Sequence, residues 1–290
     1  MPRLSKTRTS AYLFLLTNAV LWGAASPIIK YSLGFTSPTT FLLNRFVIAA
    51  IIFAPVYYLF RRTHTHKTRP ILLISLALLG TPLTLYPLFL GLNLTTSLEG
   101  SLLVASSPFF TVLGGLIFLR EVIKPKEWTG LFIALAGTLL LTAQPLLGNG
   151  APLTHFAGNF LILFSNLIWA GFLLLAKKTK VNPTELTFTS FLVSVPFFLI
   201  LALTEKQPII PSPLALPGIV YMAIFGSIIA FWAYQEGQKR IEASEAAVFS
   251  YLQPVFALPL SLLWLKEPLS PFTVLATIII AIGVYISEKR

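Results

Sequence analysis

Arg45 is a lone strong charge inside a long apolar stretch, and this makes it the first residue to examine for chemistry. Charged side chains within segments of membrane length are expensive to bury, and they usually mark function. Three roles are open for Arg45: it could meet a substrate carboxylate, it could cap helix carbonyl groups, or it could anchor the fold by pairing with Glu99.

Two carboxylates stand at the starts of apolar runs, Glu99 and Glu245. One interpretation is local, because Thr96 followed by Glu99 fits a capping box and a carboxylate suits a helix N-terminus. The other interpretation is a gate. Lys30 and Lys177 lie at matching places, so we expect ion pairs Lys30–Glu99 and Lys177–Glu245 to close opposite ends of a pathway.

Pro108 and Pro254 lie near the middle of their apolar runs. A proline within a helix removes one backbone hydrogen bond and kinks the axis. Ser106, Ser107 and Gln253 are adjacent and could satisfy the freed carbonyl groups. The matched positions favour hinges or kinks that line a cavity, and a static bend that helps packing is the alternative.

Aromatic side chains with polar tips, together with a few amides, occur inside the apolar runs. Such groups suit the wall of a site that binds amphipathic metabolites. Belts at the membrane surface are the alternative. We predict nine substrate-binding residues: Asn18, Trp22, Tyr86, Asn166, Trp169, Trp232, Tyr234, Tyr251 and Gln253.

Signals for enzymatic or metal chemistry are weak. The histidines are His64, His66 and His155, none in an H-E-x-x-H spacing, and the chain contains no cysteine. No G-x-S-x-G or phosphate-cradling motif occurs. The net charge of +11 is scattered between apolar runs, so it forms no basic face for nucleic acid. The sequence predicts neither an enzyme, a cofactor nor a metal site.

The elements that position these residues are apolar segments of membrane length. The chain is 56% hydrophobic and only 11% charged, with a mean hydropathy of +0.81. A membrane-crossing helix needs about 20 mostly apolar residues. The segments lack the alternation of a membrane barrel, so an all-α membrane protein is expected. We predict ten spans, at 11–30, 39–60, 70–92, 97–119, 128–146, 156–176, 185–204, 214–237, 244–265 and 270–287.

An internal repeat links the two halves of the chain. Adding 146 to the residues of Glu99–Glu121 gives Glu245–Glu267, with prolines, aromatic residues and terminal carboxylates in register. The first spans of each half match at a shift of 147. Further pairs in these registers are Gly80 with Gly226, Gly91 with Gly237, Gly137 with Gly283, Trp22 with Trp169, and Lys30 with Lys177.

The distribution of positive charge predicts the orientation. Of the 21 Lys and Arg residues, 17 lie at the termini and in connectors on one side, whereas Lys30, Lys206 and Lys266 lie on the other. This favours cytoplasmic termini. Each half, 1–148 and 149–290, holds five spans, an odd number. The halves are therefore predicted to be inverted repeats, which is typical of alternating-access carriers.

Several short motifs follow one another along the whole chain. They are N-A-V-L-W-G-A-A-S-P at Asn18–Pro27, L-N-R-F at Leu43–Phe46, W-T-G-L-F-I-A-L-A-G at Trp128–Gly137, L-K-E-P-L-S at Leu265–Ser270 and A-I-G-V-Y at Ala281–Tyr285. In this order and spacing they resemble the drug/metabolite transporter superfamily, and specifically its ten-span EamA-type carriers. The resemblance implies a carrier that exports amino acids or similar small metabolites through a central cavity.

The sequence thus predicts a secondary transporter in the inner or plasma membrane, in contact with the lipid bilayer and a small-molecule metabolite. Amino-acid export is the first expectation. Nucleobases, sugars or drug-like molecules are alternative substrates, and a non-transporting membrane scaffold is an alternative function. Coupling to protons and the oligomeric state are left open by the sequence.

Overall fold

The protein is a bundle of helices. The computed structural model describes residues 6–63, 68–120, 124–147 and 152–288, and every regular element within them is helical, as predicted. The α-helices are α1 (Lys6–Gly23), α2 (Ala25–Leu33), α3 (Pro38–Thr63), α4 (Pro70–Gly80), α5 (Pro82–Leu94), α6 (Ser97–Val104), α7 (Ser107–Gly114), α8 (Pro125–Ala143), α9 (Leu153–Thr179), α10 (Pro183–Thr204), α11 (Leu216–Tyr221), α12 (Ala230–Gln238), α13 (Ala243–Ala247), α14 (Gln253–Pro259) and α15 (Pro271–Glu288).

Seven helical stretches are long and apolar enough to cross a membrane, and each falls on a predicted span. The predicted spans at 244–265 and 270–287 contain shorter apolar helices, Phe249–Trp264 and Pro271–Gly283, and the one at 128–146 contains α8. The count of ten crossings stays a prediction. The seven stretches are Arg8–Leu33, Pro38–Leu59, Pro70–Leu94, Ser97–Leu119, Leu153–Thr179, Pro183–Thr204 and Pro213–Gln238.

Several of these stretches consist of two helices that meet end to end. Thr81, between α4 and α5, has φ −124° and ψ −80°, a conformation outside the α-helical region. Pro82 then starts α5. Proline lacks an N–H group, and the first turn of a helix does not need one, so a helix restarts readily at this residue. The interruption leaves carbonyl groups that other parts of the protein must satisfy.

Pro108 and Pro254 also start new helices. Each lies in the first turn, of α7 and α14 respectively, and a 3₁₀ segment at Val248–Leu252 precedes α14. The prediction of a kink inside a continuous helix is therefore corrected to a break just before each proline. The physical cause is the same missing N–H group, which disfavours a continuous helix across this position. A hinge role stays a prediction.

The two matched runs also end alike. A π-helical segment closes each run, at Gly115–Leu119 and at Leu260–Trp264. Arg120, directly after the first segment, and Lys266, two residues after the second, have left-handed backbones with φ of 57° and 54°. The next residue of the second run, Glu267, is described, whereas its counterpart Glu121 lies outside the described residues.

Glu267 connects the end of the second run to the start of the first. Its carboxylate accepts hydrogen bonds from the backbone N–H groups of Ser97 (2.7 Å) and Leu98 (2.9 Å), and from the Ser97 hydroxyl (2.9 Å). These amides are the first of α6, which have no partner within their own helix. A carboxylate from one half of the chain therefore caps a helix of the other half.

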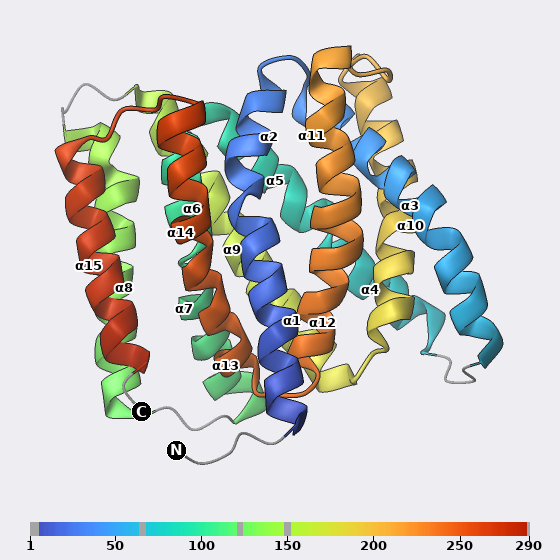
Figure 1. The fold of residues 1–290 in the computed structure, drawn as a ribbon, viewed down its shortest axis with the longest axis horizontal. Coiled ribbons are helices and arrows are strands. Elements are labelled where there is room, and N and C mark those ends of the chain that lie inside the picture. Colours follow the sequence, from blue (N-terminus) through green and yellow to red (C-terminus); the bar gives the residue numbers. More distant parts are fainter. Residues whose placement is uncertain (1–5, 64–67, 121–123, 148–151, 289–290) are drawn as a thin grey trace.

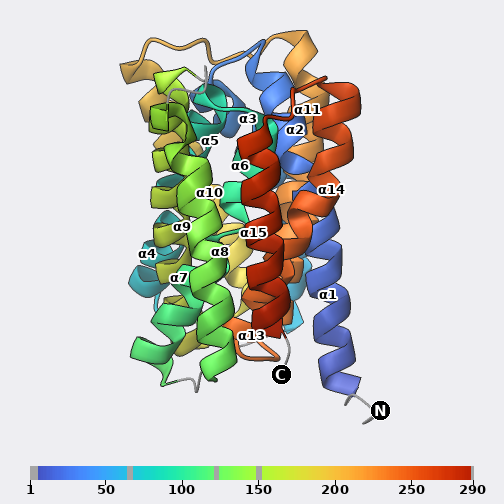
Figure 2. The same ribbon diagram turned by 90° about the vertical axis from the view of Figure 1, so that its left-hand side faces the viewer.

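Helices from both halves alternate across the bundle. At one end of the long axis of the bundle α8 packs against α15, and toward the other end α3 packs against α10 (Figure 1). Figure 2 shows α8 and α15 side by side in front of the remaining helices. Between these pairs lie the interrupted helices, where α1 contacts α12 and α5 contacts α9. The interruptions are thus concentrated in the middle of the molecule.

The α8–α15 contact depends on glycine. A Cβ atom on Gly283 would lie 2.4 Å from the backbone nitrogen of Ala134 and 2.6 Å from the carbonyl oxygen of Gly130. A Cβ atom on Gly137, at the matching position of the first half, would lie 2.8 Å from Ile280 Cγ1 and 3.0 Å from the Ala276 carbonyl oxygen. Small residues allow helices to approach closely in membranes, so the repeated glycines have a packing reason.

The matched runs cross the molecule in opposite directions. In Figure 1, α6 lies above α7, whereas α13 lies below α14. α1 begins and α15 ends at the same end of the bundle. The outer faces carry large exposed apolar side chains, such as Ile210, Leu263 and Ile71. Such surfaces suit a lipid environment rather than water.

Candidate functional site

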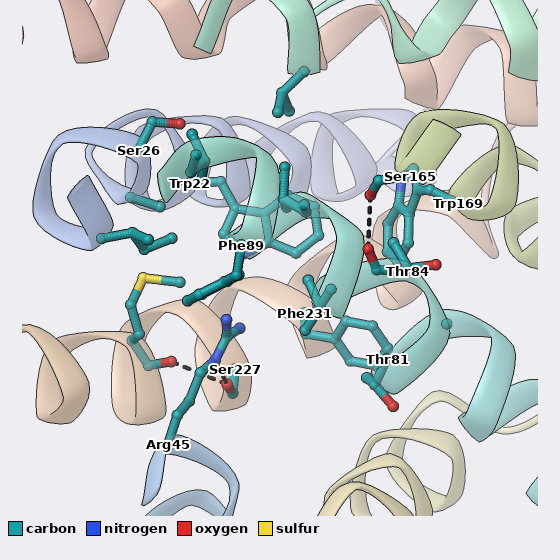
Figure 3. Close-up of a pocket in the computed structure, with 18 of the residues that line it drawn as sticks. Trp22, Ser26, Arg45, Thr81, Thr84, Phe89, Ser165, Trp169, Ser227 and Phe231 are labelled. Atoms are coloured by element: carbon teal, nitrogen blue, oxygen red, sulfur yellow. Dashed lines mark hydrogen bonds between the residues drawn. The ribbon is translucent and has the colours of Figure 1, made fainter. Parts of the chain in front are cut away.

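A cavity lies between the interrupted helices and receives residues from both halves of the chain (Figure 3). Its volume is about 90 Å³, which suits a small molecule. The wall is mainly apolar, with hydroxyl and amide groups between aromatic rings. The lining residues are Trp22, Ala25, Ser26, Ile29, Arg45, Phe46, Gly80, Thr81, Thr84, Leu85, Leu88, Phe89, Leu92, Val104, Ser107, Ser165, Asn166, Trp169, Phe191, Met222, Ser227, Phe231, Ser250 and Gln253.

Arg45 is the only charged residue in this lining. It reaches the cavity from α3 with only 4% of its surface exposed. Its Nε donates a hydrogen bond of 2.7 Å to the hydroxyl of Ser227, which in turn donates to the Met222 carbonyl at 3.0 Å. Figure 3 shows the guanidinium passing Ser227 toward Phe89, and its carbon lies 5.8 Å from that ring centre.

The π-helical segment Met222–Ile229 explains how Ser227 can hold Arg45. Its wide turns place the Ser227 hydroxyl against a carbonyl five residues back rather than four. The Ser227 hydroxyl donates its proton to this carbonyl, so its oxygen lone pairs remain available to accept from the guanidinium. Residue Thr81 occupies the matching place in the first half, at the break between α4 and α5, and also lines the cavity.

Trp22 and Trp169 form the aromatic wall predicted from the repeat. Their ring centres are 5.5 Å apart and the rings are inclined at 66°, an edge-to-face contact. Trp22 donates from Nε1 to the Gly226 carbonyl at 2.9 Å and stacks on Tyr234. Both indoles line the cavity, so their flat faces can meet an apolar ligand.

Two of the predicted amide side chains donate hydrogen bonds to the backbone near helix interruptions. Asn166 donates to the Leu103 carbonyl at 2.7 Å and to the Ser106 hydroxyl at 3.1 Å, beside the break between α6 and α7. Asn18 donates to the Ala230 carbonyl at 2.9 Å. Asn166 still lines the cavity, whereas Asn18 is buried outside the lining. Their first role is therefore to donate hydrogen bonds to backbone carbonyl groups of the protein itself.

Gln253 offers a polar group that the protein itself does not use. It lines the cavity just before Pro254 and is only 4% exposed. Within the described part of the chain, its carboxamide makes no hydrogen bond. A buried amide normally finds a partner, so this group is free to meet a ligand.

Comparisons with known proteins agree with this geometry. The model of the EamA-like transporter family matches residues 9–143 and again 156–288. The chain belongs to the EamA-like transporter family. It is 25% identical over 280 residues to the uncharacterized transporter YyaM of Bacillus subtilis (strain 168), covering 94% of this chain and 92% of that protein.

Other relatives of this EamA-family chain have similar names. An uncharacterized transporter of Archaeoglobus fulgidus is 26% identical, with 97% of this chain and 98% of that protein covered. The uncharacterized inner membrane transporter YedA of Escherichia coli (strain K12) is 26% identical, with 93% and 90% covered. These comparisons support a membrane transporter and name no substrate.

A solved crystal structure shares the fold of this EamA-family chain. It superposes with a TM-score of 0.76 over 97% of this chain and 96% of the other, at 20% sequence identity. At this identity the similarity concerns the backbone arrangement alone. The helical interruptions and the cavity chemistry therefore have to be argued from the residues of this chain.

Besides Asn18, four predicted binding residues of this EamA-family protein lie away from the cavity. Tyr86 donates to the Glu205 carboxylate, and Trp232 donates to the Thr184 hydroxyl at 3.3 Å. Tyr234 is buried behind Trp22, on which it stacks. Tyr251 is absent from the lining. All four share helices with lining residues or lie next to them, but they occupy other faces.

The predicted gate lysines bind helix ends instead of carboxylates. Lys30 donates to the carbonyl groups of Leu92 (3.1 Å) and Asn93 (3.0 Å), at the C-terminus of α5. Lys177 donates to the carbonyl groups of Gln238 and Ile241, at the C-terminus of α12. A cation at a helix C-terminus is favourable because the last carbonyls lack partners. Ion pairs Lys30–Glu99 and Lys177–Glu245 that close a gate stay a prediction.

Glu99 and Glu245 have other partners, and both are buried. The Glu99 carboxylate accepts from the Thr95 hydroxyl at 2.7 Å and from the Asn159 amide at 3.3 Å, and His155 Nδ1 lies 3.6 Å away. The Thr96 hydroxyl also caps the Glu99 N–H at 3.1 Å, as the capping interpretation predicted.

Glu245 is held by α1. Arg8 Nη2 lies 3.3 Å from its carboxylate, and the Tyr12 hydroxyl donates to it. Both carboxylates thus tie the start of a broken helix to the start of α1 or α9. Neither of them forms the predicted fold-anchoring pair with Arg45.

Proposed function

We propose that this chain is a secondary transporter that carries a small metabolite across the inner or plasma membrane by alternating access. The observation that carries the proposal is the cavity between interrupted helices, to which both halves of the chain contribute. A carrier of this type needs a ligand site that can open to either side, and helix interruptions provide positions where the walls can bend.

Matched contacts support the proposal that residues 1–148 and 149–290 are inverted repeats. Asn18 donates to the Ala230 carbonyl, and Ser165 donates to the Thr84 carbonyl at 2.8 Å. These two hydrogen bonds correspond at the shifts found in the sequence, 147 for the donors and 146 for the acceptors. The hydrogen bonds from Lys30 to the Leu92 carbonyl and from Lys177 to the Gln238 carbonyl correspond in the same way. Two halves with equivalent contacts can exchange conformations at similar energy.

The proposed direction of transport is outward, with both termini cytoplasmic. The charge distribution between connectors supports the orientation. The direction follows from the exporters that the family resemblance implies. Proton coupling enters the proposal as an alternative to passive exchange, because buried carboxylates lie near both ends of the bundle.

The test is uptake into proteoliposomes that contain the purified protein. Labelled amino acids, organic acids, sugars and nucleobases are offered with and without a pH gradient. We expect one class to enter faster than into protein-free liposomes, and acceleration by the gradient would indicate proton coupling. Folded protein that moves none of these classes contradicts the proposal and favours the scaffold alternative.

The natural chain contains no cysteine, and this provides a matched control. In a Ser26→Cys variant, a methanethiosulfonate reagent places a blocking group on a residue of the cavity wall. Transport should stop after modification and return after reduction of the same sample. Transport that continues at the full rate would show that the substrate does not pass through this cavity.

A further inference from the structure

Arg45 presents a buried charge without a counter-ion. The ion pairs among the described residues are Arg8–Glu245, Arg240–Glu236 and His155–Glu99, and none includes Arg45. Its Nε is occupied by Ser227, while its two Nη groups have no hydrogen-bond partner in the described part of the chain. Buried ionised groups are normally paired, because burial without a partner is costly. The cavity therefore lacks an anion that would complete it.

The cavity wall offers nothing that would neutralise a second positive charge. No aspartate or glutamate is among its lining residues. A zwitterion would place its carboxylate on Arg45 and leave its ammonium group in an apolar, aromatic site without a counter-ion. A neutral ligand would leave Arg45 itself unpaired. Only a ligand with one negative charge balances this site.

The number of charges also separates carboxylates from phosphates. A guanidinium binds both groups through two parallel hydrogen bonds. A phosphate ester carries a charge of about −1.5 to −2 near neutral pH, which one guanidinium does not balance. A carboxylate carries a single charge and matches the two free Nη groups of Arg45.

The rest of the wall indicates the body of the ligand. Trp22, Trp169 and Phe89 present aromatic surfaces to the cavity, and Gln253 presents an unused carboxamide. Apolar groups gain from contact with the rings. The carboxamide can donate to a carbonyl or hydroxyl oxygen on the ligand.

We propose that the cavity selects small monocarboxylates that have an apolar body and no ammonium group, and that Arg45 determines this specificity. This deepens the proposed function and rests on it for the direction of movement, but binding itself can be measured without transport. It also narrows the expectation of amino acids, whose ammonium group finds no counter-charge here.

The test uses ligands with one shared branched aliphatic body. Isothermal titration calorimetry in detergent compares isocaproate, leucine, isocaproamide and isopentyl phosphate. Isocaproate is leucine without its amino group, so this pair isolates the ammonium charge. We expect isocaproate to bind about 10- to 100-fold more tightly than the other three, the range of a lost hydrogen bond to a charged group. Leucine or the amide binding as tightly as isocaproate would overturn the proposal.

Variants of Arg45 test the assigned residue. Arg45→Gln should remove the preference for isocaproate over isocaproamide, and Arg45→Lys should retain part of it, because lysine keeps the charge but loses the two-pronged geometry. Arg240→Gln, a matched change outside the cavity, should keep the full preference. An unchanged preference in Arg45→Gln would refute the role of Arg45.

Thermal unfolding separates a loss of ligand binding in the Arg45 variant from a loss of stability. Removing an unpaired buried charge should leave the midpoint of ligand-free Arg45→Gln equal to or above that of the natural protein, while isocaproate should raise the midpoint of the natural protein only. A large drop in the unfolding midpoint of the ligand-free variant would show that Arg45 stabilises the fold instead.

Two results separate this proposal from the proposed function. If isocaproate binds but is not transported into liposomes, only the transporter proposal is contradicted. If leucine is transported and isocaproate does not inhibit this transport, only the carboxylate proposal is contradicted.

Discussion

Glu99 and Glu245 occupy matching places in the two halves, yet their partners carry different charges. The partners of Glu245 are Arg8 and Tyr12, and adding 147 to these numbers gives His155 and Asn159, the partners of Glu99. The architecture is the same at both ends of the bundle. In each case a carboxylate at the start of a broken helix is held by two residues, four positions apart, on a long helix.

The chemistry of the two clusters differs. A guanidinium keeps its charge at every physiological pH, whereas an imidazole gains and loses a proton near neutrality. His155 Nδ1 is buried without a hydrogen-bond partner, 3.6 Å from the carboxylate. The comparison teaches that equivalent contacts need not have equal strength. The Glu245 cluster contains a guanidinium, whereas the Glu99 cluster contains an imidazole beside neutral hydrogen-bond donors.

The largest effect should come from neutralising the carboxylates one at a time. Glu245→Gln removes the carboxylate that Arg8 and Tyr12 contact, and we expect a cost of about 1–3 kcal/mol, less than for a fully buried pair because Arg8 is half exposed. Glu99→Gln should cost less than about 1 kcal/mol, since Thr95 and Asn159 can still hydrogen-bond the amide. Thermal unfolding in detergent measures both. Equal losses would remove the contrast between the clusters.

Exchanging the two basic side chains should exchange the strengths of the two clusters. His155→Arg places a guanidinium beside Glu99, and Arg8→His removes the guanidinium beside Glu245. We expect labelling of a single cysteine near Glu99 to slow in His155→Arg, and labelling of a single cysteine near Glu245 to become faster in Arg8→His. His155→Asn, which adds no charge, is the control, and slowing of equal size in it would assign the effect to another cause.

The smallest effect should come from the tryptophans. Trp22 donates to the Gly226 carbonyl, whereas Trp169, its counterpart, has no such bond among the described contacts. Trp22→Phe should cost about 1 kcal/mol more in unfolding free energy than Trp169→Phe, the value of one hydrogen bond. If the two variants unfold at the same temperature, the bond to Gly226 contributes nothing.

Much of the fold could be predicted from the sequence, because length and hydropathy decide which segments can lie in a membrane. The prolines also indicated where helices are interrupted. It was less predictable which side chains face the cavity. Asn18 and Tyr234 lie on apolar segments that are buried on several sides, so no polar stripe shows which face meets the cavity.

The internal repeat also contains a signal for the surroundings of Arg45. Gly80 and Gly226 match, and each is followed by a hydroxyl residue, Thr81 and Ser227. Both hydroxyl residues line the cavity, and Ser227 holds Arg45. The contacts of Lys30 and Lys177 with helix ends could not be predicted for a different reason. Charge complementarity suggests Glu99 and Glu245 as partners, but the open carbonyls at a helix end also attract a cation.

The cap that Glu267 provides for α6 has a consequence for biogenesis. Ser97 is synthesised 170 residues before Glu267. The first backbone amides of α6 therefore lack this hydrogen-bond acceptor while most of the second half is synthesised. A first half expressed alone would never obtain this cap. Co-expression of the two halves as separate polypeptides should restore it, so maturation of the N-terminal part is completed only by one of the last segments to be translated.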